Sequence, residues 1–325
     1  MYNSPFYKGQ IQAPLNLKQI YALIDEYFAF LGQYNTVGYI ALTGGDPLLS
    51  PHFFDLLKYI NVNYGNKGIV TILGNPYHVF ECEAKRMREL GVLSYQISLD
   101  GLRDTHDKYR RKGSFDDSLR ALQILHKAGI KTLVGFTLSK TNEQELLPLL
   151  DFLSEQPYVD AFGFDRLVPT GNGAEMIDDL FSPEEYKHLL FNIYLHEVFT
   201  KPRLIVGKKD QMWRPLFFEL GLFDPIDKQS QKSFANGCTC GTSTISVLAD
   251  GTVLPGRRID LASGKYPEKT LRQLIVDSEV TKMFRDYKSY KGCNTCSANR
   301  VCKGCAAMKY AATGDFFSKD PNCWR

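Results

Sequence analysis

Short apolar runs alternate with helix-patterned stretches between residues 38 and 200. The runs are continuously apolar and rich in β-branched or aromatic residues, which is typical of strands buried on both faces. Five strand–helix units in succession predict an α/β fold with a parallel sheet, curled or open. The five predicted strands are residues 37–42, 68–73, 93–98, 132–138 and 161–164.

Sequence patterns typical of helices lie before and between the predicted strands. A helix from about Leu17 to Leu31 precedes the first strand, and no convincing strand comes before that helix. Two later pairs, Asn142 with Glu145 and Ser182 with Glu185, have the spacing of a capping box. We therefore expect helices to begin at both pairs.

The pattern changes after residue 200. The stretch 200–236 is mixed, with a helix predicted at residues 213–218. Two apolar runs within residues 244–254 flank Asp250-Gly251, which predicts a β-hairpin with a tight turn. Residues 271–284 have the apolar spacing of one amphipathic helix.

Composition and charge exclude some classes of function. Of 325 residues, 44% are hydrophobic and 23% charged, which is ordinary for a folded domain. The net charge of +3 is too weak and dispersed to indicate a nucleic acid or an anionic membrane as partner. No apolar stretch approaches the about 20 residues of a membrane helix, and the first residues lack signal-peptide features. We expect a cytoplasmic protein.

Seven of the eight cysteines lie between residues 238 and 325, whereas Cys82 stands alone. Short C-x2-C steps let two thiolates converge on one metal or cluster. In a reducing cytosol, clustered cysteines are more often metal ligands than disulfides. Structural zinc is the alternative, although zinc sites usually stop at four ligands each. The run reads Cys238-x1-Cys240, then Cys293-x2-Cys296-x5-Cys302-x2-Cys305-x17-Cys323.

This cysteine boundary indicates two parts joined by a linker. We expect an α/β domain at residues 1–200, a linker or substrate-side insert at 201–236, and a cysteine-rich domain at 237–325.

A glycine-rich turn follows the first strand. It reads Gly44-Gly45-Asp46-Pro47. Two glycines let a ligand approach the backbone, and the carboxylate can hold an ammonium group. In a parallel barrel, ligands bind at the carboxyl ends of strands, where this turn lies. Most such turns are merely tight bends, so the turn alone is weak evidence.

Four features in order along the chain resemble radical S-adenosylmethionine (SAM) enzymes with a SPASM domain, above all those that modify ribosomally made peptides. The resemblance covers residues 15 to 325 and implies a partial (β/α)6 TIM-like barrel followed by a SPASM-type iron–sulfur domain. Its features are Gly44-Gly45-Asp46-Pro47, Ile97-Ser98-Leu99-Asp100-Gly101, His106-Asp107-x2-Arg110 leading to Gly113-Ser114-Phe115, and the cysteine-rich tail.

The resemblance implies a SAM site at the strand ends. The glycine-rich turn corresponds to the loop that holds the SAM amino group, where the family usually has Glu at the position of Asp46. Ser98 and Arg110 correspond to contacts with the ribose and carboxylate of SAM. Without the neighbouring motif, a surface salt bridge would be the simpler interpretation of Arg110. The implied cofactor-binding residues are Gly44, Gly45, Asp46, Pro47, Ser98, Asp100 and Arg110.

The resemblance also implies one or two auxiliary 4Fe–4S clusters in the tail. The outer cluster would take four ligands, Cys293, Cys296, Cys302 and Cys323. The inner one would take Cys305, with Cys238 and Cys240 as companions. The family's hairpin supplies a further ligand in the pattern Gly-x4-Cys, whereas here Gly251-x4 leads to Gly256. The inner site has three visible thiolates, which either leaves an iron open to a substrate thiolate or marks a degraded site.

The family's defining C-x3-C-x2-C loop, which holds the SAM-binding 4Fe–4S cluster, does not occur: no cysteine precedes Cys82. The strand that should precede that loop is also missing. One explanation is that Met1 is an internal start, and the other is a real loss. An intact SAM loop beside a missing cluster favours the first.

The resemblance therefore implies an enzyme that modifies a precursor peptide by 5′-deoxyadenosyl-radical hydrogen abstraction, with SAM as cofactor and a reductant such as flavodoxin or ferredoxin. As given, the chain would bind clusters but not cleave SAM. The alternatives are a non-catalytic iron–sulfur protein that carries electrons or escorts a peptide, and a zinc ribbon on an inactive barrel. No catalytic acid or base is identified.

Overall fold

The computed structural model describes residues 13–222, 238–299 and 301–325. Its contacts divide the chain into two compact units. The sheet unit comprises Asn16–Arg166 and His196–Gly207, and the cysteine unit comprises Met1–Leu15, Leu167–Leu195 and Lys208–Arg325. The functional domains expected from the sequence, residues 1–200, 201–236 and 237–325, stay a prediction.

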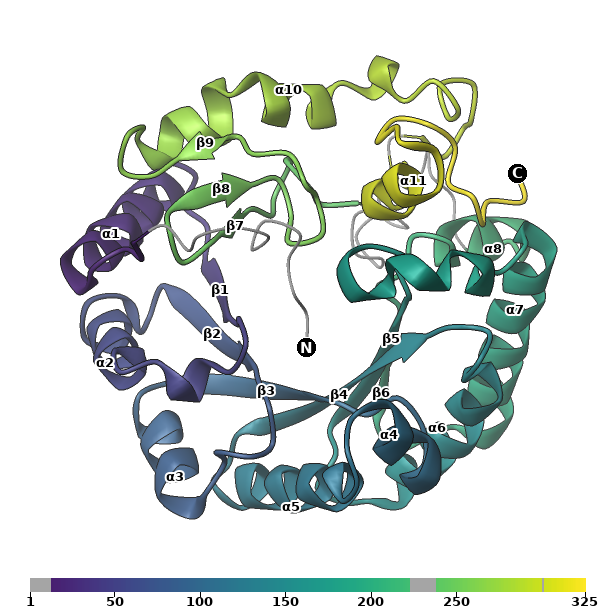
Figure 1. Cartoon of the computed structure of the whole chain (residues 1–325), viewed down its shortest axis with the longest axis horizontal. Coiled ribbons are helices and arrows are strands. Elements are labelled where there is room, and N and C mark those ends of the chain that lie inside the picture. The colour runs from purple at the N-terminus through teal and green to yellow at the C-terminus, as the bar shows by residue number, and fades with distance from the viewer. Residues whose placement is uncertain (1–12, 223–237, 300) are drawn as a thin grey trace. The chain divides into compact units, whose positions relative to one another are not determined.

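Six parallel strands in sequential order form the sheet unit, and the strands and their helices can be followed in Figure 1. This confirms the predicted α/β fold and matches a partial barrel. The strands are β1 (Gly38–Leu42), β2 (Gly68–Leu73), β3 (Val92–Ser98), β4 (Lys131–Leu138), β5 (Ala161–Arg166) and β6 (Ile205–Gly207). The sixth strand was wrongly assigned to the linker, because its three residues are too short a run to stand out from a mixed segment.

Helices follow the strands, because each buries an apolar face against the sheet. The buried core includes Leu57, Ile72, Tyr95, Leu122 and Leu150, each fully buried. The helices are α1 (Leu17–Gly32), α2 (Phe53–Tyr64), α3 (Glu81–Glu89), α4 (Arg103–Tyr109), α5 (Ser114–Lys127) and α6 (Leu146–Glu155), with short 3₁₀ turns η2 (Pro47–Leu49) and η3 (Glu143–Glu145).

Helix α1 covers the edge of the sheet. A Cβ built on Gly38 or Gly68, which are register partners in β1 and β2, would lie 2.8 or 2.7 Å from the Phe28 ring. Glycine is needed at both strand starts, because only then can this ring lie against them. Beside it, the Tyr27 hydroxyl accepts from the Tyr39 N–H at 3.0 Å and donates to its carbonyl at 3.2 Å. One side chain thus satisfies two backbone groups of the edge strand.

The cysteine unit is built from short elements around a three-stranded antiparallel sheet, in the order β7-β8-β9. The predicted hairpin is confirmed: β7 pairs with β8, Gly251 has φ 88°, and Asp250 accepts from the Thr252 N–H. The elements are η4 (Gly171–Asp179), α7 (Pro183–Thr200), α8 (Trp213–Glu219), β7 (Ser246–Val247), β8 (Thr252–Leu254), β9 (Gly264–Lys265), η5 (Gln273–Asp277), α10 (Glu279–Arg285), η6 (Tyr287–Ser289) and α11 (Ala306–Thr313).

Two helix predictions need correction. The helix expected over residues 271–284 is interrupted at Ser278, which is extended (φ −62°, ψ 129°) and donates its hydroxyl to the Ser263 carbonyl. The capping box at Asn142 is also wrong, because its amide bonds to groups outside the helix and α6 begins only at Leu146. The capping box at Ser182 and Glu185 is confirmed by both reciprocal hydrogen bonds.

None of the helices in the described ranges is long and apolar enough to span a bilayer.

The Tyr27 hydroxyl provides a test of the edge. Replacing Tyr27 with Phe keeps the ring and leaves two Tyr39 backbone groups without their partner, so the free energy of unfolding should fall by about 1 kcal/mol. Urea unfolding measures this, with Tyr34→Phe as control because Tyr34 is 61% exposed. Equal destabilisation by both substitutions would contradict the capping role.

Candidate cofactor loop and candidate metal centre

The glycine-rich turn after β1 leaves open space at its surface. Gly44 has φ 144°, which favours glycine, and a Cβ on Gly44 or Gly45 would meet no atom within 4 Å. Asp46 is different: its side chain is 2% exposed and bonded to the Leu48 N–H and to His78 Nδ1, at 3.2 and 2.7 Å. The carboxylate therefore orders the turn and the start of η2 at Pro47, while the backbone of the glycines is accessible.

Further contacts brace this turn from the neighbouring strands. The Asn75 side-chain amide donates to the Gly45 carbonyl at 3.1 Å, and the Tyr95 hydroxyl of β3 donates to the Asn75 carbonyl at 2.9 Å. The sequence indicated Asn75, since Leu73-Gly74-Asn75-Pro76 follows the second predicted strand, but sequence reasoning missed Tyr95 and His78 because only the fold brings them to the turn. The Asn-Pro pair directly after the second predicted strand was the one available signal.

Asp100 is the centre of a hydrogen-bond network beyond β3. Its Oδ2 accepts from Arg110 Nε and NH2 at 2.8 and 2.7 Å, and its Oδ1 accepts from the Thr137 N–H at 3.0 Å. Its carbonyl accepts from the Asn142 amide at 3.0 Å. Asp100 is 6% exposed, whereas the Arg110 side chain is 36% exposed. The buried carboxylate thus fixes one edge of a guanidinium that remains accessible to a ligand.

The motif around His106 holds this network in place. The Asp100 N–H donates to His106 Nδ1 at 3.1 Å, so Nε2 carries the proton toward Ser114 Oγ. Burial lowers the pKa of His106, which keeps the ring neutral. Asp107 accepts from the N–H groups of Phe115 and Gly113 at the start of α5, and these bonds lower the pKa of Asp107. The motif is a brace for Asp100 and Arg110.

Ser98 is the last residue of β3 and is half-buried. Its hydroxyl has no hydrogen-bond partner within the described ranges. Because the carboxyl ends of parallel strands share one edge of the sheet, Ser98, Asp100 and the turn after β1 all lie along that edge. These predicted cofactor residues therefore share one edge of the sheet, and their role in binding stays a prediction.

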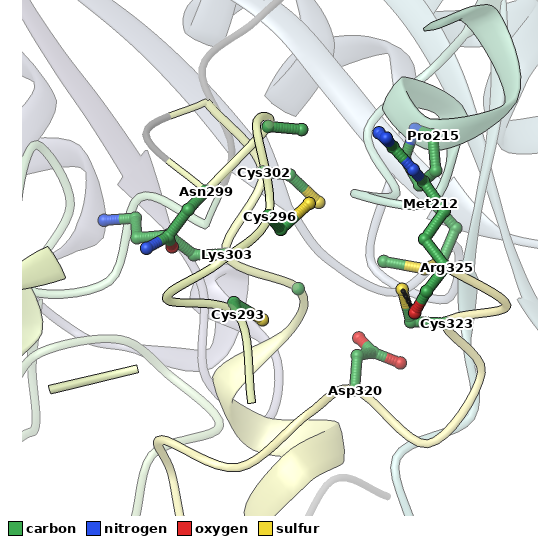
Figure 2. Close-up of a pocket in the computed structure, with 12 residues that line it drawn as sticks. Met212, Pro215, Cys293, Cys296, Asn299, Cys302, Lys303, Asp320, Cys323 and Arg325 are labelled. Carbon is green, nitrogen blue, oxygen red and sulfur yellow. Dashed lines mark hydrogen bonds between the residues drawn. The ribbon is translucent and has the colours of Figure 1, made fainter. Parts of the chain in front are cut away.

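Four cysteines line one cavity in the cysteine unit: Cys293, Cys296, Cys302 and Cys323. Figure 2 shows Cys296 and Cys302 on one side of this cavity and Cys323 on the other. Tetrahedral zinc needs its sulfurs within about 2.3 Å of one point. No group of three or more ligand-type side chains in the described residues is arranged to hold a single metal ion. Thiols spread around a shared space suit a multi-atom cluster better than one ion.

Burial makes these thiols less acidic. Burial raises the pKa of Cys302 to about 12, and it also raises the pKa of Cys293 and Cys323. Thiols in such a place become thiolates only when positive charge, such as iron, compensates them.

A buried lysine lies beside this cavity. Lys309 of α11 is 0% exposed, and its Nζ has no hydrogen-bond partner in the described structure. Its chain packs at the cavity wall, since its Cε would lie 3.0 Å from a Cβ built on Gly304, and its charge acts on Cys293. The ammonium lies 4.7 Å from the Tyr290 ring centroid. Apart from this ring contact, the ammonium has no hydrogen-bond partner among the described residues. Such a buried cation is costly, and an anionic thiolate-bound cluster in the neighbouring cavity would offset that cost.

The other three cysteines of the tail form a second group. Cys238 and Cys305 are buried, and Cys240 is half-buried. A hydrogen bond from Cys240 lowers the pKa of Cys238 to about 6, helped by the Ala306 N–H at the start of α11 and by the charge of Lys303. Cys305 is the N-cap of α11, where the helix dipole favours a thiolate. Cys82 lies apart, exposed on α3 and bonded to Glu83.

Comparison with known proteins shows what this chain resembles. Residues 14–153 match the model of the Radical SAM superfamily. Relatives that are similar over most of the chain include enzymes, named as a heme synthase and a mycofactocin maturase. The superfamily implies SAM and 4Fe–4S clusters as cofactors.

Individual relatives cover most of the chain. The chain is 29% identical to AdoMet-dependent heme synthase of Methanosarcina barkeri (strain Fusaro / DSM 804), over 92% of this chain and 86% of the relative. It is 26% identical to mycofactocin maturase MftC of Mycolicibacterium smegmatis (strain ATCC 700084 / mc(2)155), over 95% of this chain and 75% of the relative. Crystalline SuiB of Streptococcus suis with bound SAM shares the fold, with a TM-score of 0.72 and 15% identity over 98% of this chain and 72% of that one.

Lys309 should affect the cluster-free and the loaded protein in opposite ways. Lys309→Met removes a buried charge, so without iron the free energy of unfolding should rise by on the order of 1 kcal/mol. In the anaerobically loaded protein, iron should instead be lost to a chelator severalfold faster. Urea unfolding and timed chelation measure the two effects.

Lys282→Met is the control for Lys309→Met, because Lys282 is exposed and pairs with Glu279. Slower or unchanged iron loss from Lys309→Met would contradict the charge-compensating role.

His106 should make stability depend on pH. Because the pKa of His106 is lowered in the folded chain, the unfolded chain binds more protons as pH falls through about 6.5. The contribution of His106 to the free energy of unfolding is therefore fully present above that pH and is lost as the pH falls below it. In His106→Asn this component should vanish from unfolding curves measured between about pH 5 and 8, while His126→Asn, at an exposed position, should retain it. An unchanged pH dependence in His106→Asn would refute this assignment.

Proposed function

We propose that this protein is a radical SAM enzyme with auxiliary iron–sulfur clusters that modifies a peptide substrate. One observation carries the proposal: four cysteines line one cavity beside a buried ammonium that has no hydrogen-bond partner among the described residues. When bound, SAM supplies the 5′-deoxyadenosyl group whose radical abstracts a hydrogen atom from substrate.

The edge of the sheet fits SAM. The open backbone at Gly44 and Gly45 would receive the amino group, in a turn that Asp46 and His78 keep rigid. The exposed edge of Arg110, oriented by Asp100, would pair with the SAM carboxylate as a charge-assisted donor. The free hydroxyl of Ser98 would bond the ribose. In this assignment Asp46 acts by shaping the turn, since its carboxylate is already occupied by Leu48 and His78.

The tail fits an auxiliary cluster. Cys293, Cys296, Cys302 and Cys323 would hold the outer one, and the ammonium of Lys309 would offset its negative charge. The group of Cys238, Cys240 and Cys305 would hold the inner one. The given sequence contains no C-x3-C-x2-C, so the residues of this chain do not fit the SAM-binding cluster.

Two substrate classes compete. A peptide is supported by the motif resemblance and by the maturase relative, which aligns over 95% of the chain. A tetrapyrrole is the second candidate, because the heme synthase relative has the higher identity over a similar span. The cytoplasmic location and a small electron-transfer protein as reductant are part of the same proposal.

Binding measurements separate these classes. The full chain, loaded with iron and sulfide without oxygen, should bind a precursor peptide encoded beside its gene in the presence of SAM, as measured by calorimetry. Iron coproporphyrin serves as the tetrapyrrole probe. Binding of the macrocycle and not of the peptide would overturn the peptide assignment, and binding of neither would contradict both.

Arg110 should control SAM affinity. Arg110→Met removes the charge-assisted contact, so SAM should bind about 10- to 100-fold more weakly. Arg111→Met is the matched control, because the neighbouring guanidinium pairs with Asp117 instead. Calorimetry with SAM measures both variants. If Arg110→Met binds SAM as tightly as the parent chain, Arg110 is not a SAM ligand.

A further inference from the structure

The family has a cysteine in the hairpin at the position of Gly256. In this chain the sulfur of Cys240 occupies the space that a side chain at position 256 would take. A Cβ built on Gly256 would lie 2.5 Å from Cys240 Sγ, far closer than any real contact. Gly256 is buried, and its backbone does not require glycine through a positive φ. Position 256 is therefore glycine because Cys240 occupies the volume that its side chain would take.

A tight turn brings Cys240 to this point. The carbonyl of Thr239 accepts from the N–H groups of residues 242, 243 and 244, and the Gly241 N–H donates to the Pro255 carbonyl at 2.8 Å. Gly241 has φ 65°, and a Cβ there would lie 2.7 Å from Phe284. The turn thus fastens Cys240 to the end of the hairpin, next to Gly256.

The unusual Cys238-x1-Cys240 spacing has a simple consequence. In extended backbone, residues i and i+2 project to the same side, and the two thiols are hydrogen-bonded to each other. Cys238 and Cys305 belong to one buried cluster of side chains, and Cys240 packs against it. Three cysteines from two distant segments therefore lie in one part of the unit, and a side chain at position 256 would meet the sulfur of Cys240.

We propose that Cys240 supplies the thiolate that the family takes from the hairpin, so that Cys238, Cys240 and Cys305 are the cysteine ligands of the inner cluster. This inference rests on the proposed auxiliary clusters. It adds that Cys240 takes the place of the cysteine that the family has at position 256. The exchange moves a ligand by 16 residues in sequence while keeping its sulfur near the same place. A side chain at position 256 would require the sulfur of Cys240 to move from the place it has here.

A sulfur-swap experiment tests this. The full chain is loaded anaerobically with iron and sulfide, and both are counted per chain. Cys240→Ala should lose about half of the iron, because one of two clusters fails to form. The double variant Cys240→Ala/Gly256→Cys should recover that iron, because the space vacated by Cys240 admits the new side chain.

The control is Cys240→Ala/Gly256→Ala, which fills the same space without a sulfur and should stay at the low iron content. Circular dichroism checks that both double variants fold alike. Equal iron in the two double variants, or full iron in Cys240→Ala, would overturn the exchange. A parent chain that loads only the outer cluster overturns it too, whereas a parent chain that binds no iron at all refutes the proposed clusters themselves.

Discussion

The balance of buried charge is the constraint on which the cysteine unit depends. Lys309 is inaccessible to water and, among the described residues, has no hydrogen-bond acceptor at its Nζ. Lys303 is also buried, and burial lowers its pKa. Two lysines placed between two groups of cysteines are unfavourable in a metal-free protein and favourable around anionic clusters.

The sheet unit obeys a different constraint, which is preorganisation. Asp100 bonds to four partners through its carboxylate, its N–H and its carbonyl. These bonds hold the Arg110 guanidinium in one orientation at the edge of the sheet. Asp46 likewise orders a turn whose glycines stay open. In both places a buried acid holds a loop so that a more exposed group meets the ligand, which lowers the ordering cost of binding.

Much of the fold was predictable, because continuous apolar runs mark buried parallel strands, and the spaced cysteines indicated a shared cavity. Local patterns could not predict β6, which has only three residues, or the break at Ser278, which depends on its bond to Ser263. The contacts of His78 and Lys309 were equally hidden. Asp46, the partner of His78, is distant in sequence, and nothing near Lys309 distinguishes it from an ordinary surface side chain.

The central claim is that the cysteine-lined cavity holds iron and sulfide and not a single metal ion. Mössbauer spectroscopy of the full chain, loaded anaerobically with ⁵⁷Fe and sulfide, tests it most directly. The account predicts the signature of 4Fe–4S clusters in stoichiometric amount. Zinc as the sole bound metal, or cysteines paired as disulfides after the same treatment, would contradict it.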